Sequence, residues 1–186
     1  MQESGDQTNH FTANQDIPDD PDSINLLVAK LSGKDGLERE RARRSLVDIG
    51  SPAVLPLIEA LGARSKQVRW EAAKALAAIA DPAAADALVK ALEDKEFDVR
   101  WIAAEGLINL KRGSLVPLLQ ALIERSDSTW LRERAHHVLH DLAVGDLQEL
   151  LKPVVASLED IESALETPLA AKAILDRLIS EQSENR

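Results

Sequence analysis

The sequence predicts an all-α fold made of tandem helix-turn-helix units, and three observations support this. The stretch VRWEAAKALAAIADPAAADALVKAL at residues 68–92 returns as VRWIAAEGLINL from Val99, and ERERARRSLVDIG upstream fits the same frame. Only 3% of the residues are aromatic and none is Tyr, which suits thin, closely packed helices better than a β-sandwich or barrel. Stacked units of this kind build a solenoid, here expected to be a right-handed α-solenoid of about four units.

The chain is expected to begin with a disordered acidic tail at residues 1–19, which is polar and lacks an apolar period. A capping helix should follow at 20–31, because Asp20 can accept hydrogen bonds from free backbone N–H groups and Pro21 suits the first helical position. Residues 20–31 match residues 81–92. The first helix is therefore the second half of a unit and can cover the end of the core.

Four units are expected, each with a first helix, a turn and a second helix. In the first helices, apolar residues recur on one side of the cylinder, and small residues recur at one core position in three units. Small residues there let neighbouring helices approach closely. The units lie at about 37–61, 68–92, 99–122 and 131–158; the core positions are Val68, Ala72, Ala75, Leu76 and Ile79, then Val99, Ala103, Gly106, Leu107 and Leu110, then Leu131, Ala135, Val138, Leu139 and Leu142.

The second helices share a proline, at Pro56, Pro117 and Pro153, that is expected in the first helical turn. When the units are aligned on these prolines, the connection between the two helices of the fourth unit, residues 143–151, is longer than in the other units. Residues 159–180 are expected to form a degenerate C-terminal cap with a helix from about Thr167, and residues 181–186 are expected to fray.

The net charge of −10 belongs to the ends of the chain. Residues 1–22 carry acids without any Lys or Arg, residues 159–186 are also acidic, and the repeat body between them is neutral. This distribution disfavours nucleic acid and anionic membranes as partners. The absence of Cys excludes disulfides, zinc-thiolate sites and a cysteine nucleophile. With no signal peptide and no long apolar run, a cytoplasmic protein is expected.

Two motifs carry a family resemblance. The first helices show V-R-x-x-A-A-x-A-L, and the second show D/S-P-A followed by L-x-x-A-L. Over roughly residues 20–180 the chain resembles HEAT repeats of the short bacterial and archaeal type called phycobilisome-lyase-like. The resemblance implies an armadillo-like helical solenoid. Proteins of this resemblance serve as scaffolds, adaptors, chaperone-like subunits, bilin lyase subunits and, in one branch, a di-iron hydroxylase.

Catalytic and metal sites are not supported by these residues. The hydroxylases that the chain resembles carry His-Glu pairs early in several first helices, and none occurs here. His136 and His140 stand four residues apart and could grip a metal, with Asp141 or Glu133 as a third ligand. Exposed helix residues are the favoured interpretation, because one helix rarely supplies a closed site. No nucleophile arrangement and no phosphate loop occur, so neither catalysis nor a cofactor is predicted. The positions matched to the His-Glu pairs are Glu40-Arg41, Trp70-Glu71, Trp101-Ile102 and Glu133-Arg134.

Trp70 and Trp101 occupy the same position in adjacent units, nearly opposite the core, and are expected to be exposed. Apolar neighbours would extend them into a stripe for a partner or for self-association. Alternatively, each ring lies over the neighbouring helix as packing between units. The flanking residues are Ala73, Ala77, Ala104 and Ile108, with Val47 and His140 continuing the stripe.

On the second helices, a polar column of Glu59, Lys90 and Gln120 runs beside the small residues Ala60, Ala91 and Ala121. A shallow groove of this kind suits a peptide better than a small molecule.

The arginines are given structural roles. Those of RERARR alternate with Glu38 and Glu40 and are expected to form a solvated, salt-bridged helix. One arginine recurs in every unit and is expected to join the repeats, with Asp94 and Asp98 as candidate partners. The recurring positions are Arg39, Arg69, Arg100 and Arg132.

The predicted function is a non-enzymatic scaffold or adaptor that binds a protein or peptide. A lyase-type accessory or chaperone subunit that assists attachment of a bilin-like cofactor is the first alternative, and it depends on resemblance alone. A homodimer formed through Trp70 and Trp101 is the second. The candidate contact residues are Trp70, Trp101, Ile108, Glu59, Lys90 and Gln120.

Overall fold

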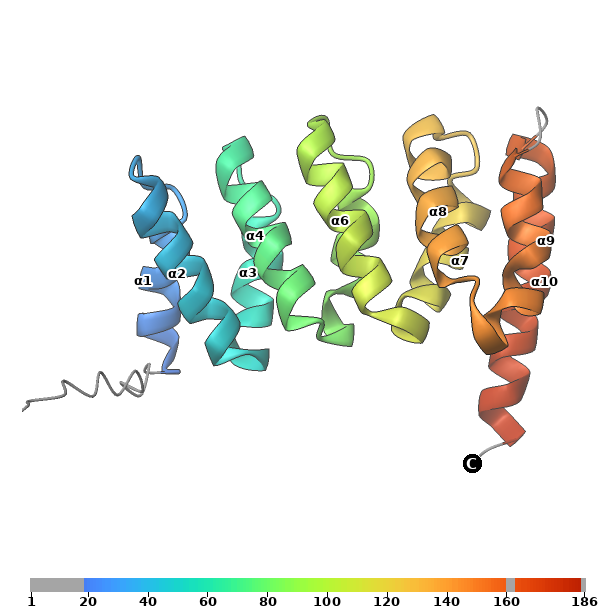
Figure 1. Cartoon of the computed structure of the whole chain (residues 1–186), viewed down its shortest axis with the longest axis horizontal. Coiled ribbons are helices and arrows are strands. Elements are labelled where there is room, and N and C mark those ends of the chain that lie inside the picture. Colours follow the sequence, from blue (N-terminus) through green and yellow to red (C-terminus); the bar gives the residue numbers. More distant parts are fainter. Residues whose placement is uncertain (1–18, 160–162, 185–186) are drawn as a thin grey trace, which may run out of the picture.

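The computed structural model describes residues 19–159 and 163–184 (Figure 1). These residues form ten α-helices and four short 3₁₀ helices, with no strand among them. The α-helices are α1 (Pro21–Lys30), α2 (Gly36–Ile49), α3 (Val54–Ala60), α4 (Lys66–Ile79), α5 (Ala85–Ala91), α6 (Phe97–Asn109), α7 (Leu115–Glu124), α8 (Thr129–Leu142), α9 (Gln148–Glu159) and α10 (Ser163–Glu184). The 3₁₀ helices are η1 (Ser51–Ala53), η2 (Pro82–Ala84), η3 (Lys111–Ser114) and η4 (Gly145–Leu147).

The helices stack in two layers (Figure 1). The front layer consists of α2, α4, α6 and α8, each packed on the next, and the back layer of α1, α3, α5 and α7. Each front helix also packs on the back helix that precedes it in the chain. This arrangement confirms the predicted all-α solenoid.

The core lies between the layers, where the apolar period placed it. Of the fifteen core positions predicted in the first helices, all are buried except Ile79, which is half-buried. Ala72, Ala103 and Ala135 are completely buried, so the small-residue column does lie between closely packed helices. At the start of the array, Asp20 Oδ1 accepts hydrogen bonds from the backbone N–H groups of Asp22 and Ser23, at 3.0 and 3.1 Å.

The recurring arginine holds the loop that precedes its own helix. Arg39, Arg69, Arg100 and Arg132 each donate from Nη1 to a backbone carbonyl six residues earlier. Arg69 also forms two bonds to Asp94 in the next loop, 2.6 Å from Nε and 2.9 Å from Nη2. Arg69 with Asp94 and Arg39 with Glu71 join adjacent units as predicted, whereas the bonds that Arg100 and Arg132 donate to backbone carbonyls hold the loops before their own helices. Asp98 pairs instead with Lys66, at 2.8 Å.

We expect the Arg69–Asp94 pair to make stability depend on acidic pH. Burial opposes ionisation of Asp94, but hydrogen bonds from Arg69 and from the Glu96 backbone N–H hold the pKa of this carboxyl below its ordinary 3.8. A lowered folded-state pKa stabilises the fold above the unfolded value and loses that effect as the pH falls through the folded value. The Tm difference between wild type and Asp94→Asn should therefore shrink from pH 6 towards ~3.

Thermal unfolding followed by circular dichroism across that range measures this difference. Asp86→Asn, which removes an exposed carboxylate on α5, is the matched control and should show little change. A Tm difference for Asp94→Asn that stays constant with pH would contradict the expectation.

The fourth unit departs from the predicted pairing. α9 packs on α8 and α10, and α10, rather than α9, makes the main contact with α7. The additional residues of the inner connection are helical and lengthen the start of α9. Pro153 therefore lies inside α9, whereas Pro56 and Pro117 lie in the first turns of α3 and α7 as predicted.

The C-terminal cap is longer than expected. α10 begins at Ser163 instead of near Thr167, and it continues to Glu184, beyond the point where fraying was expected. A stripe of Thr167, Ala171, Ile174 and Leu178 is buried along it. Spaced at helical intervals, these residues let one helix cover both α7 and α9. Three parts of the predicted organisation lie outside the described residues. They are the expected tail apart from Asp19, residues 160–162 at the start of the expected cap, and residues 185–186.

Candidate functional site

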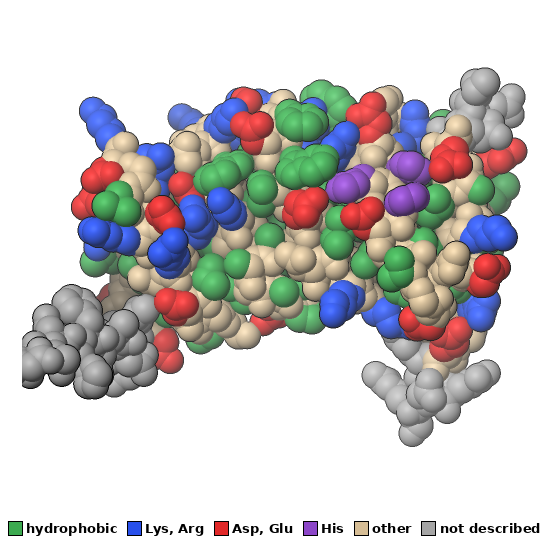
Figure 2. Space-filling view, in the orientation of Figure 1, with side chains coloured by type: hydrophobic (Ala, Val, Ile, Leu, Met, Phe, Trp, Pro, Cys, Tyr) green, Lys and Arg blue, Asp and Glu red, His purple; other side chains and the backbone are tan. Residues whose placement is uncertain are grey.

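An open aromatic groove crosses the front layer between α4 and α6. It has a volume of about 570 Å³ and is lined by Trp70, Phe97, Asp98, Trp101 and Ile102. Phe97 is 55% exposed and Trp101 40% exposed, whereas Trp70 is half-buried. In Figure 2, hydrophobic side chains gather over this part of the surface, with Lys and Arg towards α2 and the histidines over α8. We call these lining residues the aromatic groove.

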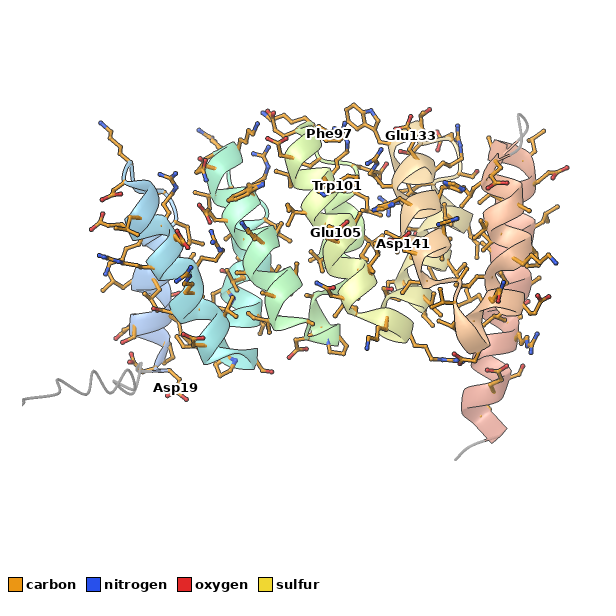
Figure 3. The ribbon with its side chains drawn as sticks, in the orientation of Figure 1. Asp19, Phe97, Trp101, Glu105, Glu133 and Asp141 are labelled. Atoms are coloured by element: carbon orange, nitrogen blue, oxygen red, sulfur yellow. The ribbon has the colours of Figure 1, made fainter. Side chains whose placement is uncertain are left out.

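Neighbouring side chains hold Trp101 in its exposed position. Phe97 lies one turn earlier on α6, with ring centroids 6.3 Å apart, and His137 of α8 stacks on Trp101 at 5.0 Å. His137 is itself held by Glu105, whose Oε1 lies 3.3 Å from its Nε2. Figure 3 shows Phe97, Trp101 and Glu105 in succession down one side of α6. The ring is therefore preorganised, which lowers the entropic cost of burying it against a partner.

Trp70 is held more closely against the protein. Lys74 Nζ lies 4.7 Å from its ring centroid and the Arg43 guanidinium carbon 6.0 Å from it. These cation–π contacts give the aromatic groove a basic margin on its α2 side. Both interpretations of the tryptophans hold in part: Trp101 is exposed, and Trp70 packs against side chains of its own and the neighbouring helix.

The predicted apolar stripe is narrower than expected. Ala73, Ala77 and Ala104 are buried, so they do not flank the tryptophans on the surface, and Ile108 is half-buried. The cause is the close approach of α4 and α6, in which small side chains let each helix cover its neighbour. Of the apolar side chains in the predicted stripe, Trp101 is thus the exposed one.

A polar pocket of about 450 Å³ adjoins the aromatic groove between α2 and α4, and the two share Trp70 and Asp98. Its wall contains Glu71, which is only 3% exposed. Glu71 Oε1 lies 3.3 Å from Arg39 Nε and accepts a 3.0 Å bond from Gln67, while Oε2 accepts from Arg43. Three donors compensate for the burial of this carboxylate. The remaining lining includes Gly36, Glu40, Lys66 and Lys74.

A second groove of about 460 Å³ lies between α3 and α5 on the back layer. Glu59, Lys90 and Gln120 are all exposed, as the predicted polar column requires, but of the three only Lys90 lines this groove. The groove does run beside Ala91, one of the small residues predicted next to the polar column. Its lining is Ile58, Leu61, Gly62, Ala83, Asp86, Ala87, Lys90, Ala91, Glu93 and Asp94.

The histidines of α8 turn to separate acidic partners. His136 Nε2 lies 3.3 Å from Glu159 Oε1 of α9, and His140 Nδ1 lies 3.5 Å from Asp141 Oδ1. Within residues 19–159 and 163–184, no group of three or more His, Asp or Glu side chains is placed to hold a metal ion. The described helices also include none with the length and hydropathy needed to cross a membrane.

Sequence reasoning missed three residues of this surface. Phe97 begins α6 and stands outside the repeat pattern. Trp130 is 45% exposed, and the guanidinium carbon of Arg100 lies 4.6 Å from its ring centroid. Glu71 is buried. An aromatic residue four before Trp101 was a usable signal for Phe97, because residues four apart share a helix face. No such signal existed for Glu71, whose burial depends on arginines about thirty residues away.

The chain was compared with curated proteins, with solved structures and with models of protein families. No curated protein shows a significant match. Similar solved structures include an engineered protein (21% identity, 82% of this chain and 81% of the other, TM-score 0.42). Another is a computationally designed armadillo repeat protein for modular peptide recognition (24% identity, 81% of both chains, TM-score 0.41). A third is a designed armadillo repeat protein in complex with the peptide (KR)4, with the same identity, coverage and TM-score.

The family model described as HEAT repeats matches residues 54–140. That range begins at the first residue of α3 and ends inside α8, so it covers α3 to α7 and most of α8. The central part of the chain is therefore similar to HEAT repeats, in agreement with the packing of α3 to α8.

Proposed function

We propose that this protein is a non-catalytic scaffold that binds a protein or peptide through the aromatic groove. The observation that carries the proposal is the exposed pair Phe97 and Trp101, which lines an open groove and is held in place by His137. Large aromatic side chains that are rigid before binding commonly supply most of the energy at protein interfaces. The groove is open rather than enclosed, which favours an extended chain segment over a small molecule.

The proposal predicts that truncating both rings weakens partner binding at least tenfold. Phe97→Ala/Trp101→Ala removes the apolar contact area, and each truncation at such a position commonly costs more than ~1 kcal/mol. Quantitative affinity capture with mass spectrometry, comparing the variant with wild type, measures this loss.

Leu165→Ala/Leu169→Ala is a suitable control, because both leucines are more exposed than the rings and lie on α10. Every wild-type partner should be recovered with this control. Undiminished recovery of every partner by the Phe97→Ala/Trp101→Ala variant would exclude the aromatic groove as the binding surface.

The back-layer groove is a second candidate surface, favoured by its volume and by Lys90 in its lining. Glu59→Ala/Lys90→Ala in the same capture experiment would remove two charges of this layer. Loss of a partner with this variant alone would assign binding to the back layer.

Two other functions stay predictions. A homodimer through Trp70 and Trp101 would dissociate on dilution in light scattering, and Trp101→Ala would shift that transition to higher concentration. A lyase-type accessory role would be indicated by retention of a bilin after incubation with the protein. The HEAT-repeat match does not extend to the phycobilisome-lyase-like type.

A further inference from the structure

We infer that the partner segment is acidic and carries a large apolar side chain next to its carboxylates. This inference rests on the proposed function and adds the chemistry of the occupant. Its basis is the direct continuation of the aromatic groove into the polar pocket, through the shared residues Trp70 and Asp98. A segment lying across both would place an apolar side chain between Phe97 and Trp101 and its neighbouring groups beside Lys74.

Among the described residues, the polar pocket contains one cation, Lys74, that has no carboxylate partner. Each carboxylate that lines it already has a basic partner: Glu71 has Arg39 and Arg43, Glu40 has Arg44 at 2.6 Å, and Asp98 has Lys66 at 2.8 Å. Lys74 has no carboxylate partner within the described part of the chain, and its ammonium lies over Trp70. An incoming carboxylate would therefore complete an ion pair without displacing an existing one.

The margin on the other side of the aromatic groove is also basic. Arg100 lies 5.7 Å and Arg134 5.5 Å from the Phe97 ring centroid. Arg100 donates to the Asp94 backbone carbonyl and pairs with no side-chain carboxylate within residues 19–159 and 163–184, while Arg134 has only the distant oxygen of Glu133 at 3.8 Å. The exposed ring of Phe97 is thus bordered by cations whose charges are weakly compensated.

These observations favour an acidic occupant over a basic one. A basic segment would meet Lys74, Arg100 and Arg134 around the rings, and the lining acids would have to give up their present partners. An acidic segment meets the available cations, and its apolar side chain is buried against Phe97 and Trp101. The acids that line this path, Glu40, Glu71 and Asp98, are each paired with a basic residue, and Glu105 nearby lies beside His137.

Fluorescence anisotropy with labelled synthetic peptides tests the inference on the full chain. One set of peptides carries a central Trp, Phe or Leu flanked by glutamates, and a matched set carries lysines in place of the glutamates. At low salt, we expect the wild type to bind at least one acidic peptide and none of the basic set. We expect Lys74→Glu to weaken that binding about tenfold, because an attraction becomes a repulsion.

Lys152→Glu, the same change at an exposed lysine of α9, is the control and should bind like wild type. Equal binding of both peptide sets, binding of neither, or equal affinity of Lys74→Glu and wild type would each overturn the inference. If ring truncation abolishes partner capture but charge reversal has no effect, the proposed function stands and the acidic partner is wrong. If neither ring truncation nor charge reversal weakens binding, the proposed function and the acidic partner are both wrong.

The chain itself contains an acidic sequence, residues 1–18, which includes Glu3, Asp6 and Asp16 together with Phe11 and Ile17. Neutralising these acids with Glu3→Gln/Asp6→Asn/Asp16→Asn in the full chain separates the two occupants. Unchanged affinity for the acidic peptide supports a partner segment. Tighter peptide binding by the neutralised chain would overturn the external partner and assign the surface to the chain's own N-terminal residues.

Discussion

Replacing Glu71 by glutamine is expected to lower the free energy of unfolding by ~3 kcal/mol, because it leaves two arginines without their buried counter-ion. Glu71 is 3% exposed, and Arg39 and Arg43 are mostly buried around it. A neutral amide keeps the volume but cannot balance either guanidinium, and its NH₂ group adds a donor where acceptors are needed. For a chain of this length, the loss corresponds to a Tm decrease of about 6–12 °C.

Thermal and urea unfolding of Glu71→Gln measure this effect. Glu40→Gln removes the carboxylate that pairs with the exposed Arg44 on the surface of α2. It is the matched control and should change stability by less than ~0.5 kcal/mol. If Glu71→Gln destabilises no more than Glu40→Gln does, the three-donor arrangement around Glu71 does not hold in solution.

Replacing Gly106 by valine is expected to cost ~3 kcal/mol of unfolding free energy, through separation of α4 from α6. A Cβ at Gly106 would lie 3.0 Å from Leu88 Cδ1, 3.3 Å from Ala77 Cβ and 3.4 Å from Ala77 Cα. Leu88 can rotate, but the backbone of α4 at Ala77 can move only by shifting the helix. The two further methyl groups of valine make the collision worse and outweigh the small advantage of valine over glycine in helix propensity.

The control for this prediction is Gly36→Val at the exposed start of α2, where the nearest atom to a new Cβ is an arginine side-chain nitrogen at 3.5 Å. Urea unfolding should show a much smaller loss for this variant. Because α4 and α6 carry the aromatic groove, Gly106→Val should also weaken partner capture. A Gly106→Val variant as stable as wild type would mean that the helices are farther apart than described.

The fold was largely predictable because its causes are local. The spacing of Val99, Ala103 and Leu107 defines a buried helix face, and Asp20 with Pro21 defines the start of a helix; both signals act within a few residues. Repetition then multiplies the same signal along the chain. From their shared position on the repeat, the sequence predicted that both Trp70 and Trp101 are exposed; this is correct for Trp101, whereas Trp70 is half-buried.

The end of the array was not predictable in the same way. Whether α9 or α10 lies against α7 depends on which helix buries more apolar surface there, a comparison between segments far apart in the chain. The stripe that includes Ala171 and Ile174 allows α10 to cover two helices at once. The periodic pattern of the earlier units contains no information about that competition.

By itself, the sequence determined the repeated helices and their buried faces, because helical periodicity and capping are properties of neighbouring residues. Only the tertiary structure decided that Phe97, Trp101 and His137 form one stacked surface, that Glu71 is buried between two arginines, and that Lys74 has no carboxylate partner in the described chain. The physical reason is that charge pairing and ring stacking depend on side chains from different units. Their distances are set by how closely the helices pack.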